Sequence, residues 1–236
     1  MPTTRKQSPA ARVRRAAPAQ VVCILSRKKS LYSTRRLVQA AKAQGLRPVV
    51  LDTLRCNVVI DSGHPALRYG TEPVPPPDVV IPRIGASITG YGLAVVTQLE
   101  LMGVPVLNRA LAIAQSRDKL RCLQLLGAQG VGVPTTVMAH RHTDADRLVE
   151  QVGGLPVIVK LIQGTQGIGV MIARTMEEAV TLLNTFWDLG HDVLLQRFVA
   201  ESEGRDVRAF VVGDQVVAAM RRQARAGEFR SNIHRG

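Results

Sequence analysis

The sequence predicts an α/β protein in two parts: an open parallel-sheet domain, followed by an α+β part in which helices alternate with antiparallel hairpins. Three observations lead to this prediction. In the first half, β-branched runs of strand length such as Val21–Leu25 alternate with helical apolar patterns, which is typical of βαβ units. Glycine follows several of the helical patterns, where it ends a helix. In the second half, turns containing glycine join strand-like runs directly.

The composition limits the class of protein. A chain of 236 residues, 46% of them apolar, is long enough for one large domain or two small ones. Aromatic residues make up only 3%, so we expect a core of Val, Leu, Ile and Ala. The apolar runs are far shorter than the ~20 residues that span a bilayer, so no membrane insertion is expected. Cys23, Cys56 and Cys122 are odd in number and widely spaced, which predicts small buried thiols in a reducing cytoplasm rather than disulfides or a metal site.

The charge is strongly positive, with a formal net charge of +13. Residues 1–19 are basic and contain no acid, and we interpret them as a disordered tail, with a transit peptide as the alternative. An excess of positive charge fits nucleic acid or an acidic or phosphorylated partner. The scarcity of aromatic residues argues against single-stranded nucleic acid, because bases usually stack on aromatic rings.

The first domain is expected over residues 20–113. Its β-branched and apolar runs predict strands, and its apolar residues at helical spacing predict helices. In chain order the predicted elements are a strand at 21–25, a helix at 34–44 ended by Gly45, a strand at 48–51, a loop at 73–77, a strand within 78–85, a helix at 91–102 and a strand at 104–108.

The second part begins near Ala114, and its first helix is predicted by leucines at helical spacing and ended by Gly130. The predicted elements are a helix at 115–129, a strand at 133–139, a helix at 144–151, a strand at 156–161, a loop at 164–169, a strand at 170–173, a helix at 175–188, a strand at 193–199 and a hairpin over 209–220.

The strand ending at Lys160 is followed by the glycine-rich loop GTQGIG and a further strand. Glycines let a backbone approach an anion closely, and a lysine at the strand end supplies a positive charge for phosphate. The loop lacks the Gly-Lys-Ser/Thr ending of a P-loop and leads into a strand rather than a helix. A hairpin lid over phosphates fits these features, and an ordinary glycine-rich turn fits them equally well.

Three further segments favour an anionic ligand. SRDKL places Arg117 and Lys119 in a helical segment that could supply a second cation, and LLQRFV provides a strand edge that could receive adenine. The stretch MRRQARAGEFRSN gathers arginines, which prefer phosphate and carboxylate partners. Each of these segments alone is also consistent with a solvated or core element. His140 and His142 are expected to be surface residues, and no Ser/His/Asp arrangement is evident.

Together these segments resemble the RimK-type α-L-glutamate ligases of the ATP-grasp superfamily. The matching segments, in family order, are LSRKKSLYSTRRLVQAA, VVIPRIGASITGYG, LNRALAIAQSRDKLRCLQLL, GLPVIVKLIQGTQGIGV, LLQRFV and GEFRSNIHRG. The resemblance implies a pre-ATP-grasp domain at 20–113, an ATP-grasp small subdomain with its lid at 114–195, and the start of the large subdomain at 196–236.

The resemblance also implies a reaction: ATP-dependent addition of L-glutamate to the C-terminal carboxylate of a small-subunit ribosomal protein, whose tail is acidic, through an acyl phosphate. The implied catalytic residues are Arg222 and Lys160. The implied ATP-binding residues are Lys119 and Lys160 at the phosphates, Gly164, Thr165, Gln166, Gly167 and Gly169 in the lid, Gln196, Arg197, Phe198 and Val199 at adenine, Asp206 at the ribose, and Arg230, Ser231 and Asn232 near the phosphates or acceptor.

Two departures from the family pattern are present. Arg197 stands where the family usually has Glu. The family also continues beyond the point that corresponds to Gly236, and its magnesium or manganese ligands lie in that continuation, so the sequence predicts an incomplete ATP-grasp domain without metal ligands. Two alternatives stay open: a chain that binds ATP, RNA or ribosomes without catalysis, and a related ligase for a small-molecule or peptide carboxylate. Assembly into a homo-oligomer is also left open.

Overall fold

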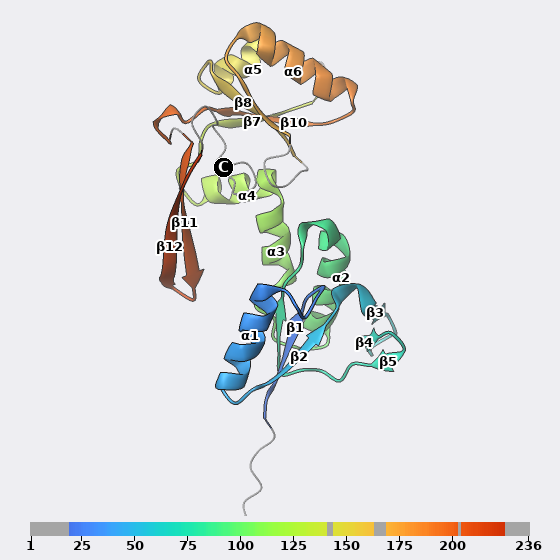
Figure 1. The fold of residues 1–236 in the computed structure, drawn as a ribbon. Helices are drawn as coiled ribbons and strands as arrows, with labels where there is room; N and C mark the ends of the chain where they lie inside the picture. The colour runs from blue at the N-terminus through green and yellow to red at the C-terminus, as the bar shows by residue number, and fades with distance from the viewer. Residues whose placement is uncertain (1–18, 141–143, 163–168, 203, 225–236) are drawn as a thin grey trace, which may run out of the picture. The chain divides into compact units, whose positions relative to one another are not determined.

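The computed structural model describes residues 19–140, 144–162, 169–202 and 204–224. The chain divides between Ile113 and Ala114 into two compact units, which are coloured blue to green and green to red in Figure 1. Across the residues described, no helix is both long enough and apolar enough to cross a membrane.

A three-stranded parallel sheet forms the centre of the first unit. Strand β1 (Val21–Leu25) lies between β2 (Arg47–Leu51) and β6 (Val79–Pro82), and both pairings are parallel. Helix α1 (Tyr32–Ala43) connects β1 to β2 and contacts both strands. The predicted βαβ unit is therefore confirmed. A central parallel strand with a helix on its face is buried, which explains the continuous apolar run VVCIL.

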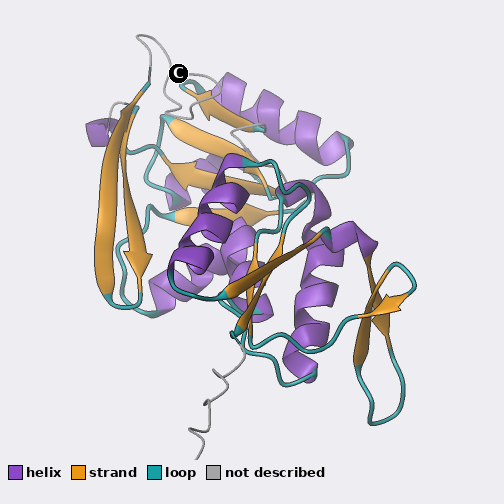
Figure 2. Cartoon of the chain, turned by 60° about the horizontal axis from the view of Figure 1, so that its bottom comes forward, coloured by secondary structure: helices purple, strands orange, loops and turns teal. Residues whose placement is uncertain are grey.

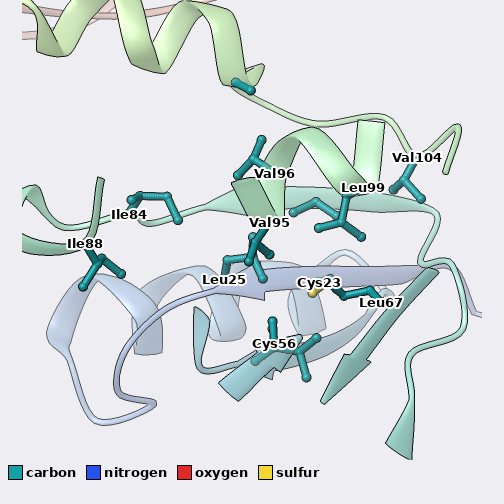
Figure 3. Packing of buried hydrophobic residues seen from close by; sticks show 13 residues of the cluster. Cys23, Leu25, Cys56, Leu67, Ile84, Ile88, Val95, Val96, Leu99 and Val104 are labelled. Atoms are coloured by element: carbon teal, nitrogen blue, oxygen red, sulfur yellow. The ribbon is translucent and has the colours of Figure 1, made fainter. Parts of the chain in front are cut away.

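Helix α2 (Thr89–Leu101) buries its apolar side chains against this sheet. Figure 3 shows Leu25 of β1 close to Val95 of α2, within a cluster that also contains Leu99. Burial of one such side chain contributes about 1.5–3 kcal/mol. The cluster contains Cys23 and Cys56, so these two thiols are buried as the sequence predicts, whereas Cys122 is only half-buried.

A second, antiparallel sheet in this unit is absent from the sequence prediction. It comprises β3 (Cys56–Val59), β4 (Ala66–Tyr69) and β5 (Glu72–Pro73). The strands are only two to four residues long, too short to produce a clear pattern. Tertiary contacts hold β3 and β4, because the Gln98 amide donates to the carbonyl oxygens of Val59 at 2.8 Å and Ala66 at 3.0 Å. The strand predicted over 104–108 is reduced to one parallel bridge between residues 80 and 106.

The second unit contains a four-stranded antiparallel sheet with helices on one face (Figure 1). The strands lie in the order β7-β10-β8-β9. Helices α5 and α6 contact the sheet, and α6 begins with a capping box formed by Thr175 and Glu178. The elements are β7 (Thr136–Ala139), α5 (Ala145–Gln151), β8 (Val157–Leu161), β9 (Val170–Ala173), α6 (Met176–Asp188) and β10 (Val193–Arg197).

The prediction of one helix over 115–129 is wrong, because two helices occupy this stretch. Helix α3 (Ala110–Arg117) ends before Asp118, and α4 (Lys119–Ala128) begins after it. The Asp118 backbone is extended, and its side-chain oxygen accepts a hydrogen bond from the backbone N–H of Arg121 at 2.9 Å. This N-cap starts a new helix and puts Lys119 at its first position.

The predicted hairpin exists but is longer than the sequence indicates. Strands β11 (Arg205–Val212) and β12 (Gln215–Gln223) form a two-stranded antiparallel ribbon, drawn as two long strands in Figure 2. The turn uses Gly213 at φ +63°, a conformation that favours glycine. Apolar side chains of this ribbon, including Val207 and Phe210, are exposed.

Candidate functional site

Two lysines from separate segments lie close together in the second unit. Lys119, at the start of α4, donates from Nζ to the carbonyl oxygen of Leu161 at 2.9 Å, 42 residues further along the chain. Lys160 immediately precedes Leu161 at the end of β8. The N-cap of α4 and the end of β8 therefore bring two ammonium groups close together. Binding of phosphate by this pair stays a prediction.

Both ammonium groups have perturbed acidity. Burial lowers the pKa of Lys160, and repulsion by Lys119 lowers it further. Burial also lowers the pKa of Lys119. Among the described residues, neither lysine forms an ion pair with a carboxylate, and their hydrogen bonds go to neutral oxygens. Two partly desolvated positive charges without a negative partner are costly, and an anionic ligand would relieve that cost.

A chain of side-chain hydrogen bonds holds Lys160 in place. Its ammonium group donates to Oε1 of Gln196, and Nε2 of Gln196 donates to Oγ1 of Thr136 at 2.7 Å. The Thr136 hydroxyl in turn donates to the carbonyl oxygen of Pro134 at 2.8 Å. Since lysine can only donate, the direction of every bond in the chain is determined.

Strand register explains how these three side chains meet. Gln196 of β10 lies directly opposite Thr136 of β7, and Lys160 of β8 lies opposite Leu194, two residues before Gln196. Alternate residues of a strand point to the same face, so all three polar side chains share one face of the sheet. The other face carries the apolar cluster beneath α5 and α6, which includes Val159 and Leu195.

The segment predicted to bind adenine begins with the buried Gln196, which is 7% exposed. Arg197, the departure from the family pattern, has an exposed side chain, and its backbone N–H donates to the carbonyl oxygen of Thr135 at 2.9 Å. Phe198 is half-buried and Val199 is 38% exposed. The side chain of Arg197 is therefore exposed to solvent, whereas that of Gln196 is buried and hydrogen-bonded.

The glycine-rich loop is described only at its last residue. Gly169 has φ +72°, and its carbonyl oxygen accepts a hydrogen bond from the backbone N–H of Leu161 at 2.9 Å. A Cβ atom at Gly169 would lie 2.8 Å from Cδ1 of Leu161, so a larger residue does not fit without movement. Other predicted ligands lie outside the described residues, namely Gly164, Thr165, Gln166, Gly167, Arg230, Ser231 and Asn232.

Asp206 and Arg222, predicted to have separate roles, bind each other across the hairpin. They are register partners on β11 and β12. Nε of Arg222 donates to Oδ1 of Asp206 at 2.7 Å, and a second guanidinium nitrogen donates to the other carboxylate oxygen. Hydrogen bonding to Asp206 raises the pKa of Arg222. Such a bidentate pair orients the guanidinium group firmly.

Sequence reasoning missed two parts of the site. Thr136 lies in a predicted strand, but only the register with β10 shows that it contacts Gln196. The carbonyl group of Leu161, which receives Lys119, belongs to the main chain and has no sequence signal. Within the described ranges, no three His, Cys, Asp or Glu side chains are grouped so that they could hold a metal ion.

Two family models together match nearly all of the chain outside its N-terminal tail. The RimK PreATP-grasp domain matches residues 21–113, and the RimK-like ATP-grasp domain matches residues 116–236. The chain belongs to the RimK family of ATP-grasp proteins.

Curated relatives of this RimK-family chain agree with the match. Proteins named "Probable alpha-L-glutamate ligase" from Pseudomonas aeruginosa (strain PAO1) and Vibrio vulnificus (strain YJ016) are 52% and 50% identical over 215 residues. In both cases the match covers 91% of this chain and 71% of the relative.

Solved structures agree on the fold. A RimK domain ATP-grasp protein from Sphaerobacter thermophilus has a TM-score of 0.67 at 22% identity, covering 87% of this chain and 73% of that one. The D-alanyl-alanine synthetase A of Vibrio cholerae has a TM-score of 0.59 at 17% identity, covering 92% and 70%. The predicted family, the mixed α/β fold and the enzyme class, an ATP-dependent ligase, are confirmed. The roles of individual residues stay predictions.

Proposed function

We propose that this RimK-family chain binds ATP at Lys119 and Lys160 and uses it to join L-glutamate to the C-terminal carboxylate of an acceptor protein. The acceptor that fits best is a small-subunit ribosomal protein with an acidic tail. The observation that carries the proposal is the pairing of two partly buried lysines without a carboxylate partner among the described residues. A triphosphate supplies the negative charge that this pair lacks.

The chain's own groups have distinct proposed roles. Lys119 and Lys160 contact the phosphates, the loop at 164–169 covers them, and residues 196–199 receive adenine through backbone groups. Asp206 binds the ribose and Arg222 the transferring phosphoryl group. The Asp206–Arg222 bond supports a preformed orientation of the guanidinium group, since no side-chain ordering is then needed when ligand binds. The proposed anion-binding site is completed by Arg230, Ser231 and Asn232, near the phosphates or the acceptor.

The proposed chemistry has two steps. An oxygen of the acceptor carboxylate attacks the γ-phosphorus of ATP, and ADP leaves with the bridging oxygen, which gives an acyl phosphate. The amine of L-glutamate then attacks the acyl carbon, loses a proton, and expels inorganic phosphate, which leaves an amide. Cations that surround the phosphates stabilise the charge that develops in the first step. Lys160, held by Gln196, serves this purpose without reorganisation.

A divalent metal ion belongs to the proposal as well. One solved structure of the ATP-grasp ligase PsnB is a complex with a precursor variant, Mg and ADP, and that protein has a TM-score of 0.62 to this chain. We propose magnesium or manganese for the present family member, where it would neutralise phosphate charge. Described residues do not form a group of metal ligands. The roles given above therefore concern only the chain's cations and polar groups.

A second candidate function is binding of RNA or ribosomes without catalysis. The net charge of +13 favours it, and a cytoplasmic location suits both candidates. A third, a ligase for a small-molecule or peptide carboxylate, differs only in the acceptor. Steep salt dependence of RNA binding, unaffected by ATP, would favour the second candidate.

The decisive experiment is calorimetric titration of the 236-residue protein with ATP and magnesium. Lys160→Met should weaken ATP binding by at least about tenfold, because it removes a partly buried charge from the phosphate site. Lys28→Met is the matched control: it removes an exposed lysine of the other unit and should leave affinity unchanged. Equal affinity of the wild-type and Lys160→Met proteins would overturn the site. Incubation with L-glutamate and candidate acceptors, followed by mass spectrometry, identifies the acceptor.

A further inference from the structure

A basic groove lies between α1 and the edge strand β2 of the first unit. Its volume is about 500 Å³. Three exposed cations line it, namely Lys29, Arg35 and Lys42, above a floor that includes the half-buried side chains of Val38, Pro48 and Val50. The groove therefore combines positive charge with an aliphatic surface.

The sequence around the groove is unusually one-sided in charge. Between Leu25 and Asp52 the chain has seven Lys or Arg residues and no Asp or Glu. Arg35, Val38 and Lys42 follow one another at intervals of three and four residues, which puts them along one face of α1. Arg27 is neutralised by Asp52, with Nε 2.8 Å from the carboxylate. Lys29, Arg35 and Lys42 form no ion pair within the described part of the chain.

The backbone of β2 narrows the kind of ligand that fits. The backbone N–H of Arg47 donates to the carbonyl oxygen of Gln20, and the carbonyl oxygen of Leu51 accepts from the backbone N–H of Ser26. The backbone N–H and C=O groups of residues 47, 49 and 51 therefore point toward β1. The backbone groups of residues 48 and 50 consequently point toward the open edge of the sheet, and Pro48 has no N–H to donate there. Proline at an edge blocks the addition of another strand. We therefore expect side chains, rather than a regular sheet ladder, to contribute most of the contacts to a ligand.

We propose that the groove between α1 and β2 binds the acidic tail of the acceptor protein, as an extended glutamate-rich peptide. This rests on the proposed function and adds a docking surface to it. Glutamate carboxylates pair with Lys29, Arg35 and Lys42, while glutamate methylenes lie against Val38 and Pro48. Among the described residues, none that lines the groove is an aromatic residue on which a nucleic-acid base could stack. An acidic peptide therefore fits the groove better than single-stranded RNA. Affinity should rise as glutamates are added.

The test measures binding of a fluorescein-labelled oligo-L-glutamate peptide to the whole protein by anisotropy, at low salt and without nucleotide. The triple variant Lys29→Gln, Arg35→Gln, Lys42→Gln should raise the dissociation constant about tenfold, since each exposed pair contributes modestly. The matched control is Arg121→Gln, Arg174→Gln, Arg208→Gln, which removes the same charge from exposed sites in the other unit. This control should bind the peptide nearly as well as the wild-type protein.

Several outcomes would overturn the groove. They are absence of peptide binding by the wild-type protein, an unchanged affinity of the groove variant, equal losses in both triple variants, and groove-dependent binding of labelled oligouridylate but not of the peptide. ATP titration of the same samples separates the two proposals. Binding of ATP without the peptide refutes the groove alone, whereas binding of the peptide without ATP refutes the ATP site alone.

Discussion

The ammonium group of Lys160 donates a hydrogen bond to the side-chain oxygen of Gln196, 36 residues away on the neighbouring strand. Gln196 is buried, and its other end is held by Thr136 at 2.7 Å. A partly buried lysine such as Lys160 loses some of its hydration, and a neutral amide oxygen replaces only part of it. The site therefore keeps Lys160 oriented without neutralising its charge.

Gln196→Leu should weaken ATP binding because it removes the oxygen that orients Lys160. The expected loss is about 1.5–3 kcal/mol of binding free energy, the range for a hydrogen bond to a charged group. Calorimetric titration measures it directly. Gln129→Leu is a suitable control, since Gln129 is exposed at the end of α4. Unchanged affinity in Gln196→Leu would mean that this residue does not position Lys160.

Thr136→Val should destabilise the fold by about 1–3 kcal/mol, because the Gln196 amide would lose its buried acceptor while the side-chain shape is nearly kept. Thr136→Ser keeps the hydroxyl and should restore most of the stability. Urea unfolding measures the difference, and ATP titration should follow the same order of variants. Similar stability of the Val and Ser variants would contradict a role for the hydroxyl.

ATP binding at a pH between the lowered lysine pKa and 10.5 should take up protons. Burial lowers the pKa values of Lys119 and Lys160 below 10.5, repulsion by Lys119 lowers that of Lys160 further, and a bound polyanion favours the charged forms of both. Proton uptake is expected between the lowered pKa and 10.5, and it should disappear at pH values well below the lowered pKa. Calorimetry in buffers of different ionisation enthalpy counts the protons. Lys160→Met should show less uptake than the wild-type protein, and equal uptake in the two would refute this assignment.

The same shifts predict how stability depends on pH. Below the folded-state pKa both lysines are charged, and the cost of burying that charge lowers the free energy of unfolding. As pH rises from the folded-state pKa toward 10.5, the unfolded state binds more protons than the native state, so this contribution to stability rises. Replacing Lys160 with Met should flatten this part of the curve. The measurement is urea unfolding across the alkaline range for both proteins.

Gly169→Ala should cost more stability than Gly190→Ala. Both glycines have left-handed φ values, +72° and +78°. Each substitution therefore carries about 1–2 kcal/mol of backbone cost. The two positions differ in the space for an added Cβ atom. At Gly169 this atom would lie 2.8 Å from Cδ1 of Leu161, whereas at Gly190 it would have nothing within 4 Å. Thermal unfolding of the two variants isolates the contribution of Leu161. Equal melting temperatures would show that Leu161 moves freely.

Local patterns were sufficient for the elements with strong periodicity. The apolar runs of β1 and β8 and the apolar spacing of α6 predicted these elements correctly, because burial of one or both faces requires apolar side chains at those positions. The family resemblance rested on other segments as well, and of these three elements it included the whole of β8 alone, within GLPVIVKLIQGTQGIGV. Residue patterns indicated Lys160 with a second cation from the segment of Arg117 and Lys119, and the resemblance singled out Lys119. The four-residue strands β3 and β4 were not predicted, since packing against α2 rather than their own pattern holds them.

Tertiary structure decided how the site is assembled. The break at Asp118 directs Lys119 to the Leu161 carbonyl, and a cap within a helical pattern is difficult to distinguish from helix continuation. The contact between Thr136 and Gln196 depends on strand register, and a shift of one residue would turn these side chains to opposite faces. Register is set by the whole sheet. For that reason the chemical types of the site residues were readable from the sequence, whereas their partners were decided by the fold.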